Sequence, residues 1–274
     1  MDSLVIGRSL PLVSLLFLLF ASAAAQAQTE STAPLKADGG IFALPVELDI
    51  DRGAANGDAS ILRIQPLYTF PVFDKWKLVH LDVITLADAP GGTPAFPGDP
   101  AQADNKAGIS DLLHASFFTP DTTGNFVWGV GINMSLPTAT TRSLGSGKWA
   151  AGPAFRLTYR AGPWNLGVVA SQRWSFAGSS NRSDVNQLLI RGAIRRQLKD
   201  DWYFVSAPII TANWGVDGEK WLVPVGGGVG RRFSVGRYPW AWSVQGYYNA
   251  IRPDPAPDWV FRLGLIAAFP FGQR

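Results

Sequence analysis

The sequence predicts an antiparallel transmembrane β-barrel of about twelve strands, preceded by a cleavable signal peptide. Segments of roughly 10 to 14 residues alternate apolar with small or polar side chains, and tryptophans stand at the segment ends. An indole combines a large apolar ring with one N–H donor, so it prefers the border between hydrocarbon and water. Two tryptophan belts around period-2 segments are typical of an outer-membrane barrel. One belt comprises Trp76, Trp164, Trp202, Trp240 and Trp242, and the other comprises Trp149, Trp174, Trp214, Trp221 and Trp259.

The N-terminus has the layout of a secretory signal peptide. Arg8 precedes an apolar run over residues 10–20, and small residues follow as far as Ala27. The run is too short to cross a bilayer as a helix, and no later segment reaches about 18 uninterrupted apolar residues. We therefore expect a signal peptide at 1–27, a periplasmic segment at 28–40 and a barrel at 41–271, located in the outer membrane.

Composition excludes several classes of function. The chain has no cysteine, which rules out disulfides and thiolate chemistry. Its net charge of +3 is too small to indicate a nucleic-acid partner. Tryptophans at strand ends also do not form the sheet-face platform on which bases stack.

Period-2 alternation predicts each strand in turn. Phe126, Val130 and Ile132, for example, share one face, and Gly129 and Asn133 share the other. The twelve expected strands lie at 41–50, 60–70, 75–87, 108–118, 126–135, 147–160, 164–176, 184–197, 202–214, 220–233, 239–250 and 258–271.

The connections between these strands alternate in length. Tight turns at 71–74, 161–163, 198–201 and 234–238 are separated by longer joins at 52–59, 88–107, 136–146, 177–183 and 251–257. Bacterial barrels have short periplasmic turns, long outer loops and both termini in the periplasm, which an even strand number satisfies. The longest join, 88–107, is rich in Pro, Gly and Asp and is a candidate gate over the mouth.

The chemistry of such a barrel predicts its partners. The outer wall should contact outer-membrane lipid and lipopolysaccharide, and Lys148 is placed to reach a lipopolysaccharide phosphate. Alternate apolar residues from Phe261 to Phe271 resemble the signal that the bacterial barrel-assembly machinery reads in a final strand. The Gly-rich turn LGSGK lacks P-loop spacing, which argues against a nucleotide site.

Three segments carry a family resemblance: LPTATTRSLGSGKWAAGPAF (136–155), AGPWNLGVVASQRWSFAG (161–178) and SDVNQLLIR (183–191). They resemble an outer-membrane transporter family of the meta-pathway phenol-degradation type, some members of which carry the label "neuromedin U". The resemblance covers roughly residues 130–270. It implies a barrel of around twelve strands and a role in the uptake of small molecules.

Charged and polar residues opposite the apolar rows are candidates to line the lumen. An arginine in the middle of a lipid-facing strand would cost a few kcal/mol, so such residues should point inward. An excess of basic over acidic side chains there would favour anions in a pore. The candidate lumen-lining residues are Arg63, His80, Asp82, His114, Arg156, Arg173, Arg191, Arg195 and Arg262.

The two histidines raise the alternatives of catalysis and metal binding. His114 and Ser116 share a strand face, as a His-x-Ser pair does in outer-membrane phospholipases, where the histidine activates the serine. The sequence offers no convincing third residue to orient the imidazole. Without cysteines or a dense carboxylate cluster, the signal for a metal is poor. We therefore expect no enzyme, no cofactor and no metal.

The leading hypothesis is a passive outer-membrane channel for small solutes. The family resemblance favours aromatic or hydrophobic compounds, and the basic interior favours small anions. One alternative is a non-conducting structural barrel of the outer membrane. A second alternative is an outer-membrane lipid hydrolase that uses the His-x-Ser pair.

Overall fold

A computed structural model describes residues 40–90, 105–122 and 124–271 of the 274-residue chain. The predicted signal peptide and most of the predicted gate at 88–107 lie outside the described residues. No helix in the described ranges is long and apolar enough to cross a bilayer. The described chain is almost entirely β-strand, with one short 3-10 turn at Arg142–Leu144.

The twelve predicted strands are confirmed, although three of them are interrupted. The interrupted strands are β2 (Ala59–Ile64) with β3 (Leu67–Phe73), β5 (Lys106–Ile109) with β6 (Leu112–Pro120), and β11 (Trp202–Ser206) with β12 (Ile209–Asn213). The continuous strands are β1 (Gly40–Arg52), β4 (Trp76–Ala89), β7 (Phe126–Leu136), β8 (Lys148–Ala161), β9 (Trp164–Gly178), β10 (Asn186–Gln197), β13 (Trp221–Val235), β14 (Tyr238–Ile251) and β15 (Trp259–Phe271).

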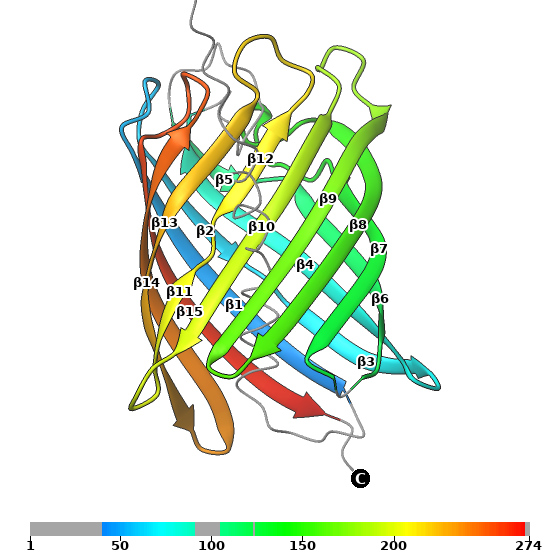
Figure 1. The fold of residues 1–274 in the computed structure, drawn as a ribbon. Coiled ribbons are helices and arrows are strands. Elements are labelled where there is room, and N and C mark those ends of the chain that lie inside the picture. Colours follow the sequence, from blue (N-terminus) through cyan, green and yellow to red (C-terminus); the bar gives the residue numbers. More distant parts are fainter. Residues whose placement is uncertain (1–39, 91–104, 123, 272–274) are drawn as a thin grey trace, which may run out of the picture.

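The strands form one closed antiparallel barrel. Each strand pairs with its neighbours in the sequence, and β1 pairs with β15 from Gly40–Phe271 to Arg52–Trp259, which closes the cylinder. The strands are strongly tilted against the barrel axis (Figure 1). Because no edge remains, every strand can satisfy its backbone donors and acceptors through its neighbours.

Two of the interruptions coincide with prolines. Pro66 separates β2 from β3, and Pro208 separates β11 from β12; proline has no N–H to donate to the ladder. Their carbonyls still accept hydrogen bonds, from Asp82 N at 3.1 Å and from Gly192 N at 2.8 Å. The wall therefore bends at these points without opening.

The two ends of the barrel differ as the alternation of loop lengths predicts. The tight turns, the beginning of β1 and the end of β15 lie at one end of the barrel, and the longer loops lie at the other (Figure 1). We call these the short-turn end and the long-loop end. Positive φ angles at Gly162 (55°) and Gly236 (59°) allow two of the tight turns.

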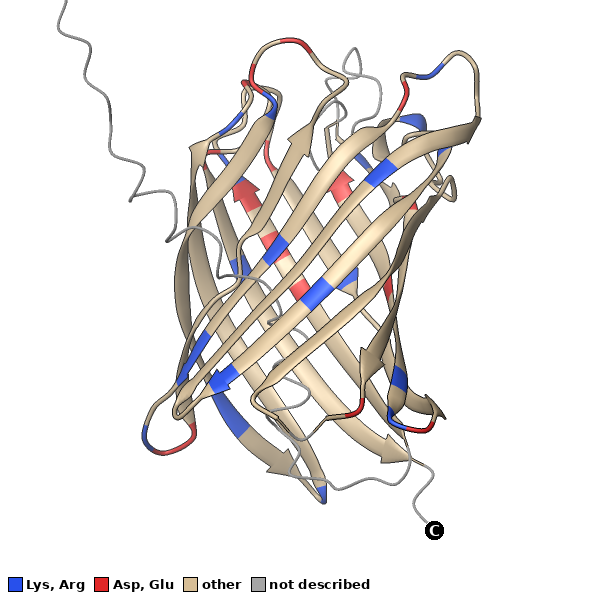
Figure 2. Cartoon of the chain, turned by 45° about the vertical axis from the view of Figure 1, so that its right-hand side comes forward, with Lys and Arg blue, Asp and Glu red and all other residues tan. Residues whose placement is uncertain are grey.

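The outer face of the barrel is apolar and is bordered by tryptophans. Trp149, Trp174 and Trp214 are 40%, 48% and 39% exposed near the long-loop end, rather than buried in a core. At the short-turn end, Trp76 and Trp128 meet edge to face with ring centroids 6.0 Å apart. Charged residues are sparse along the wall and more frequent in the turns and loops at both ends (Figure 2).

The glycine run in β13 is a site of close backbone approach, one of the uses of glycine inside a strand. A Cβ atom on Gly226 or Gly228 would lie 2.0 or 1.8 Å from a carbonyl oxygen of β14, and one on Gly227 would lie 2.8 Å from Val205 O. The run therefore lets β13 pack tightly between its two neighbours.

Replacing Gly228 with alanine should destabilise the barrel by about 1–3 kcal/mol, because the added methyl collides with backbone rather than a mobile side chain. The matched control is Gly246→Ala, whose Cβ would meet only the Phe261 ring at 3.9 Å. Urea denaturation of the refolded protein in detergent measures both. Equal midpoints for the two variants would refute the close-packing account.

Candidate functional site: the barrel lumen

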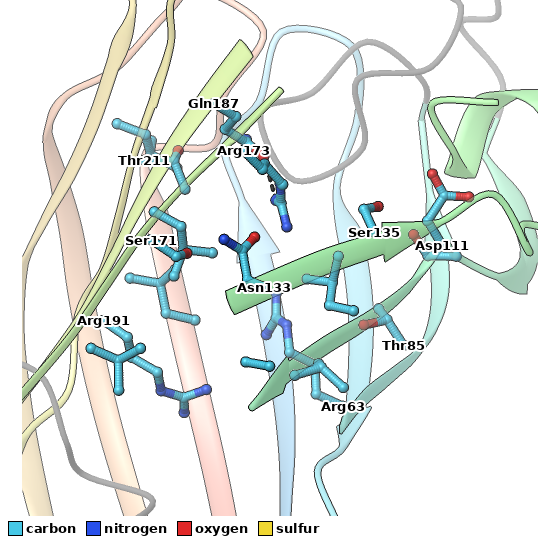
Figure 3. A pocket seen from close by; sticks show the side chains of 18 of the residues that line it. Arg63, Thr85, Asp111, Asn133, Ser135, Ser171, Arg173, Gln187, Arg191 and Thr211 are labelled. Atoms are coloured by element: carbon cyan, nitrogen blue, oxygen red, sulfur yellow. Dashed lines mark hydrogen bonds between the residues drawn. The ribbon is translucent and has the colours of Figure 1, made fainter. Parts of the chain in front are cut away.

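The lumen contains a cavity of about 260 Å³, close to the size range of small-ligand pockets. Its walls mix polar and apolar side chains, and Figure 3 shows ten of the polar ones converging from opposite sides of the barrel. The lining includes Asp49, Asp51, Arg63, Leu81, Val83, Thr85, Asp111, Leu113, Asn133, Ser135, Ser171, Arg173, Gln187, Leu189, Arg191, Ile209, Thr211, Leu222, Tyr247, Val260 and Arg262.

An acidic row on β1 was missed by the sequence analysis. Glu47 and Asp49 are buried and bonded to arginines of the interior, and Asp51 lines the cavity beside them. The signal was present, because these acids alternate with Val46, Leu48 and Ile50 in the same way as arginines alternate with apolar residues elsewhere. The net charge of the interior is therefore much closer to zero than the predicted inward arginines alone would make it.

Asp49 is the centre of a buried ion triad. Arg262 donates from Nε at 2.7 Å and from Nη2 at 2.8 Å to the two oxygens of this carboxylate, and Arg63 donates from Nη1 at 2.6 Å. The Asp49 and Arg262 side chains are both only 3% exposed. Bidentate geometry of this kind makes strong, directional contacts between a guanidinium and a carboxylate.

Arg191 bridges the lumen from the opposite wall. From β10 its guanidinium donates to Gln65 Oε1 at 2.6 Å and to Glu47 Oε1, although β10 is a neighbour of neither β1 nor β2. Gln65 Nε2 in turn donates to Glu47 Oε2 at 3.0 Å. This Arg191–Glu47–Gln65 bridge forms the floor of the cavity.

Towards the short-turn end, the interior is packed with apolar side chains. One cluster brings together residues of six strands from different sides of the barrel: Ala43, Leu67, Val79, Phe117, Ala154 and Ala268. A second comprises Ala193, Tyr203, Val205, Ala207, Ala241 and Ile266. Below the bridge, these two clusters therefore narrow the described part of the lumen.

The remaining predicted arginines also lie on the inner face. Arg195 lies over the Tyr203 ring, 3.9 Å from its centroid, and Arg173 donates to Gln187 Oε1. Arg156 is 1% exposed and donates from Nη1 to Thr119 Oγ1 at 3.4 Å. The structure thus brings Arg63, Arg191 and Arg262 together around the acids of β1, with Arg173 higher on the cavity wall.

The prediction that His80 and Asp82 line the lumen is wrong, because their side chains point outward, as does the side chain of His114. The inward residues of these strands are Val79 and Phe117, which are 2% and 0% exposed, whereas Phe118 on the outward row is 45% exposed. The register between β4 and β6 is unbroken there, so alternation places the histidines on the outer wall. His114 is nevertheless among the residues that border the cavity, together with its neighbours Leu113 and Ala115. On these two strands the apolar residues face the lumen and polar residues face outward, which reverses the pattern of the other strands.

The loop between β7 and β8 folds over the long-loop end of the cavity. Asp111 accepts hydrogen bonds from Ser146 N and Oγ, both at 2.7 Å, and Leu144 is fully buried against Ile61 and Ala87. The family-like LGSGK segment is therefore a structural cover.

The expectation that Lys148 reaches a lipopolysaccharide phosphate is corrected. Its Nζ lies 3.0 Å from Asp184 Oδ1, and its side chain is only 11% exposed. Hydrogen bonds from Lys148 and Ser175 hold the pKa of the Asp184 carboxyl below its ordinary value. The lysine is thus engaged within the protein.

Within residues 40–90, 105–122 and 124–271, no group of three or more His, Asp or Glu side chains could hold a metal ion. The chain has no cysteine to add to such a group.

Comparison with solved structures places the fold among outer-membrane barrels. An outer membrane channel from Pseudomonas putida F1 is similar at a TM-score of 0.62 and 12% identity, covering 86% of this chain and 97% of that chain. No family model and no curated protein matches the sequence. The chain thus has the fold of a twelve-stranded outer-membrane β-barrel, and nothing in the comparisons supports the label "neuromedin U".

Two weaker likenesses carry no functional argument. The CymD monoaromatic hydrocarbon channel has a TM-score of 0.45 at 11% identity and covers 91% of this chain and 93% of that chain. The translocator domain of the autotransporter NalP from Neisseria meningitidis has a TM-score of 0.46 at 9% identity and covers 90% and 94%.

Asp49→Asn should destabilise the barrel by about 3–5 kcal/mol, because it leaves Arg63 and Arg262 without their buried counter-charge. The matched control is Asp58→Asn. It breaks an exposed pair with Arg52 at 3.4 Å and should cost less than about 1 kcal/mol. Urea midpoints in detergent compare the two. A shift for Asp49→Asn no larger than that of the control would show that the triad does not stabilise the fold.

Proposed function

We propose that this protein is an outer-membrane channel for small solutes with substantial apolar surface. The observation that carries the proposal is the cavity: a closed barrel with an apolar outer face encloses a space lined by both aliphatic and hydrogen-bonding side chains. Pockets of this composition suit small molecules that combine an apolar body with one or two polar groups.

The apolar outer face of the barrel also supports a location in the outer membrane. An exposed apolar band bordered by tryptophans is stable only in a bilayer, and a closed barrel meets the need to pair every backbone group there. We propose that the long-loop end faces outward and that residues 1–27 direct export and are removed. Outer-membrane lipid and lipopolysaccharide then surround the wall, and the barrel-assembly machinery inserts it.

The charge pattern favours solutes with apolar surface over small anions. Three of the four arginines that line the cavity are paired with Glu47 or Asp49: Arg63, Arg191 and Arg262. Asp51 and Asp111 also line the cavity, so its wall does not carry an excess of positive charge. Together with the resemblance to the phenol-degradation transporter family, this supports hydrophobic or aromatic compounds as the transported class.

The Arg191–Glu47–Gln65 bridge is the proposed gate. It lies across the lumen at the floor of the cavity, and movement of a single long side chain would remove its main contact. A solute that reaches the cavity from the long-loop end therefore meets a barrier of buried polar contacts, followed by the apolar packing below.

The double variant Glu47→Ala, Arg191→Ala should raise conductance in planar bilayers several-fold over the wild type, because it removes the bridge without leaving a lone buried charge. The control, Arg252→Ala with Asp258→Ala, removes a 2.6 Å pair in an outer loop and should leave conductance unchanged. In proteoliposomes, toluene uptake should exceed acetate uptake.

The same measurements decide the alternative of a structural barrel. If the folded double variant conducts no better than the wild type and toluene uptake matches that of empty vesicles, the barrel is non-conducting. Preferred uptake of acetate would instead overturn the assignment of apolar solutes.

A further inference from the structure

Four polar side chains form a hydrogen-bonded cluster on the outer wall of the barrel, separate from the lumen. The cluster comprises His80 and Asp82 on β4, and His114 and Ser116 on β6. The register pairs His80 with Ser116 and Asp82 with His114. The cluster lies within an apolar surface, beside Phe118 and Ile132, which are 45% and 55% exposed. Ionisable residues on a bilayer-facing surface are costly, which marks them as functional by default.

The distances in this cluster are those of a nucleophile, a base and an orienting acid. Ser116 Oγ lies 2.7 Å from His114 Nε2, and His114 Nδ1 lies 2.7 Å from Asp82 Oδ1. The sequence offers no evident third residue to orient the imidazole, and Asp82 takes that place from the neighbouring strand. Serine becomes a nucleophile when an oriented imidazole can take its proton.

His80 completes the arrangement. Its Nδ1 also lies 2.7 Å from Ser116 Oγ. One assignment of tautomers satisfies every contact: His80 Nδ1–H donates to Ser116, Ser116 O–H donates to His114 Nε2, and His114 Nδ1–H donates to Asp82. The N–H of His80 thus lies beside the atom that would attack, where an oxyanion would form.

The depth of the cluster in the bilayer determines which esters can reach it. His80 lies four residues from Trp76 along β4, which at about 3.3 Å per residue and a 40° tilt puts Ser116 roughly 10 Å inside the tryptophan belt. A phospholipid holds its ester groups near the headgroup level, because its phosphate stays in water. A neutral acyl ester has no such anchor and can bring its carbonyl to this depth.

We propose that Asp82, His114 and Ser116, with His80, form an esterase site on the bilayer-facing wall that hydrolyses neutral acyl esters dissolved in the membrane. The apolar side chains of Phe118 and Ile132 pack against the acyl chain. The site adds an activity to the proposed channel and does not depend on it.

The reaction uses only the ester, water and these side chains. Ser116 Oγ attacks the carbonyl carbon as His114 Nε2 takes the hydroxyl proton, and the carbonyl electron pair moves to an oxygen that accepts a hydrogen bond from His80. The ester C–O bond then breaks, and His114 returns its proton to the leaving alcohol. Water, deprotonated by His114, attacks the acyl-serine, so the carboxylic acid leaves and Ser116 regains its proton. Asp82 acts as a positioning residue that keeps His114 in the required tautomer.

The test uses the full chain reconstituted in phosphatidylethanolamine vesicles that contain 1,2-dioleoylglycerol. The wild type should release oleate from the diacylglycerol faster than from the phospholipid, and an alkyl fluorophosphonate should label Ser116. Ser116→Ala should lower release by about a thousand-fold or more and abolish labelling. The control Ser234→Ala, on β13 away from the cluster, should match the wild type in both.

Asp82→Asn tests the positioning residue. It should slow fluorophosphonate labelling and lower the rate at saturating diacylglycerol by about a hundred-fold or more with little change in KM, since it alters the tautomer and not the binding surface. Unchanged planar-bilayer conductance of Ser116→Ala separates this site from the channel. The proposal is overturned if folded wild type neither hydrolyses diacylglycerol nor takes the label, or if Ser116→Ala retains its rate. Faster release from phosphatidylethanolamine would overturn the assignment of neutral esters.

Discussion

The two-residue period of a β-strand governs this molecule, because in a closed barrel each side chain must face either the bilayer or the lumen. With no strand edge left open, the backbone is satisfied by the ladder, and only the side chains distinguish inside from outside. A polar residue on the outer row must therefore face the hydrocarbon of the bilayer. Most of the wall obeys this constraint, and β4 and β6 depart from it.

In the lumen, the same constraint brings charged side chains of the inner rows together. Arginines that cannot face hydrocarbon turn inward, and the acids of β1 meet them there. The resulting ion pairs do two things at once: they compensate buried charge, and they close the cavity floor with the Arg191 bridge. Apolar clusters occupy the space below. A barrel of this size can therefore be a gated channel without any separate plug among its described residues.

The inverted strands link the two sites proposed for the protein. Val79 and Phe117 fill the lumen towards the short-turn end, and the strand period then forces His80 and Ser116 onto the outer wall. The packing that narrows the lumen is thus also the reason why a Ser–His–Asp arrangement meets the bilayer. The sequence shows no third residue to orient His114, and in the structure Asp82 lies in that position across the strand pair.

The strand number, the alternation of turns and loops, the tryptophan belts and the inward arginines could all be predicted from the sequence, because each depends on local periodicity and on the cost of charge in hydrocarbon. It could also have shown the acids of β1, which alternate with Val46, Leu48 and Ile50. Which row of β4 and β6 faces the lumen could be seen only in the folded barrel. Both rows mix apolar and polar residues, so the choice depends on what packs across the barrel interior. Likewise, the contact of Arg191 with Glu47 and of His114 with Asp82 joins residues far apart in the chain, and no local pattern encodes which partners a closed cylinder brings together.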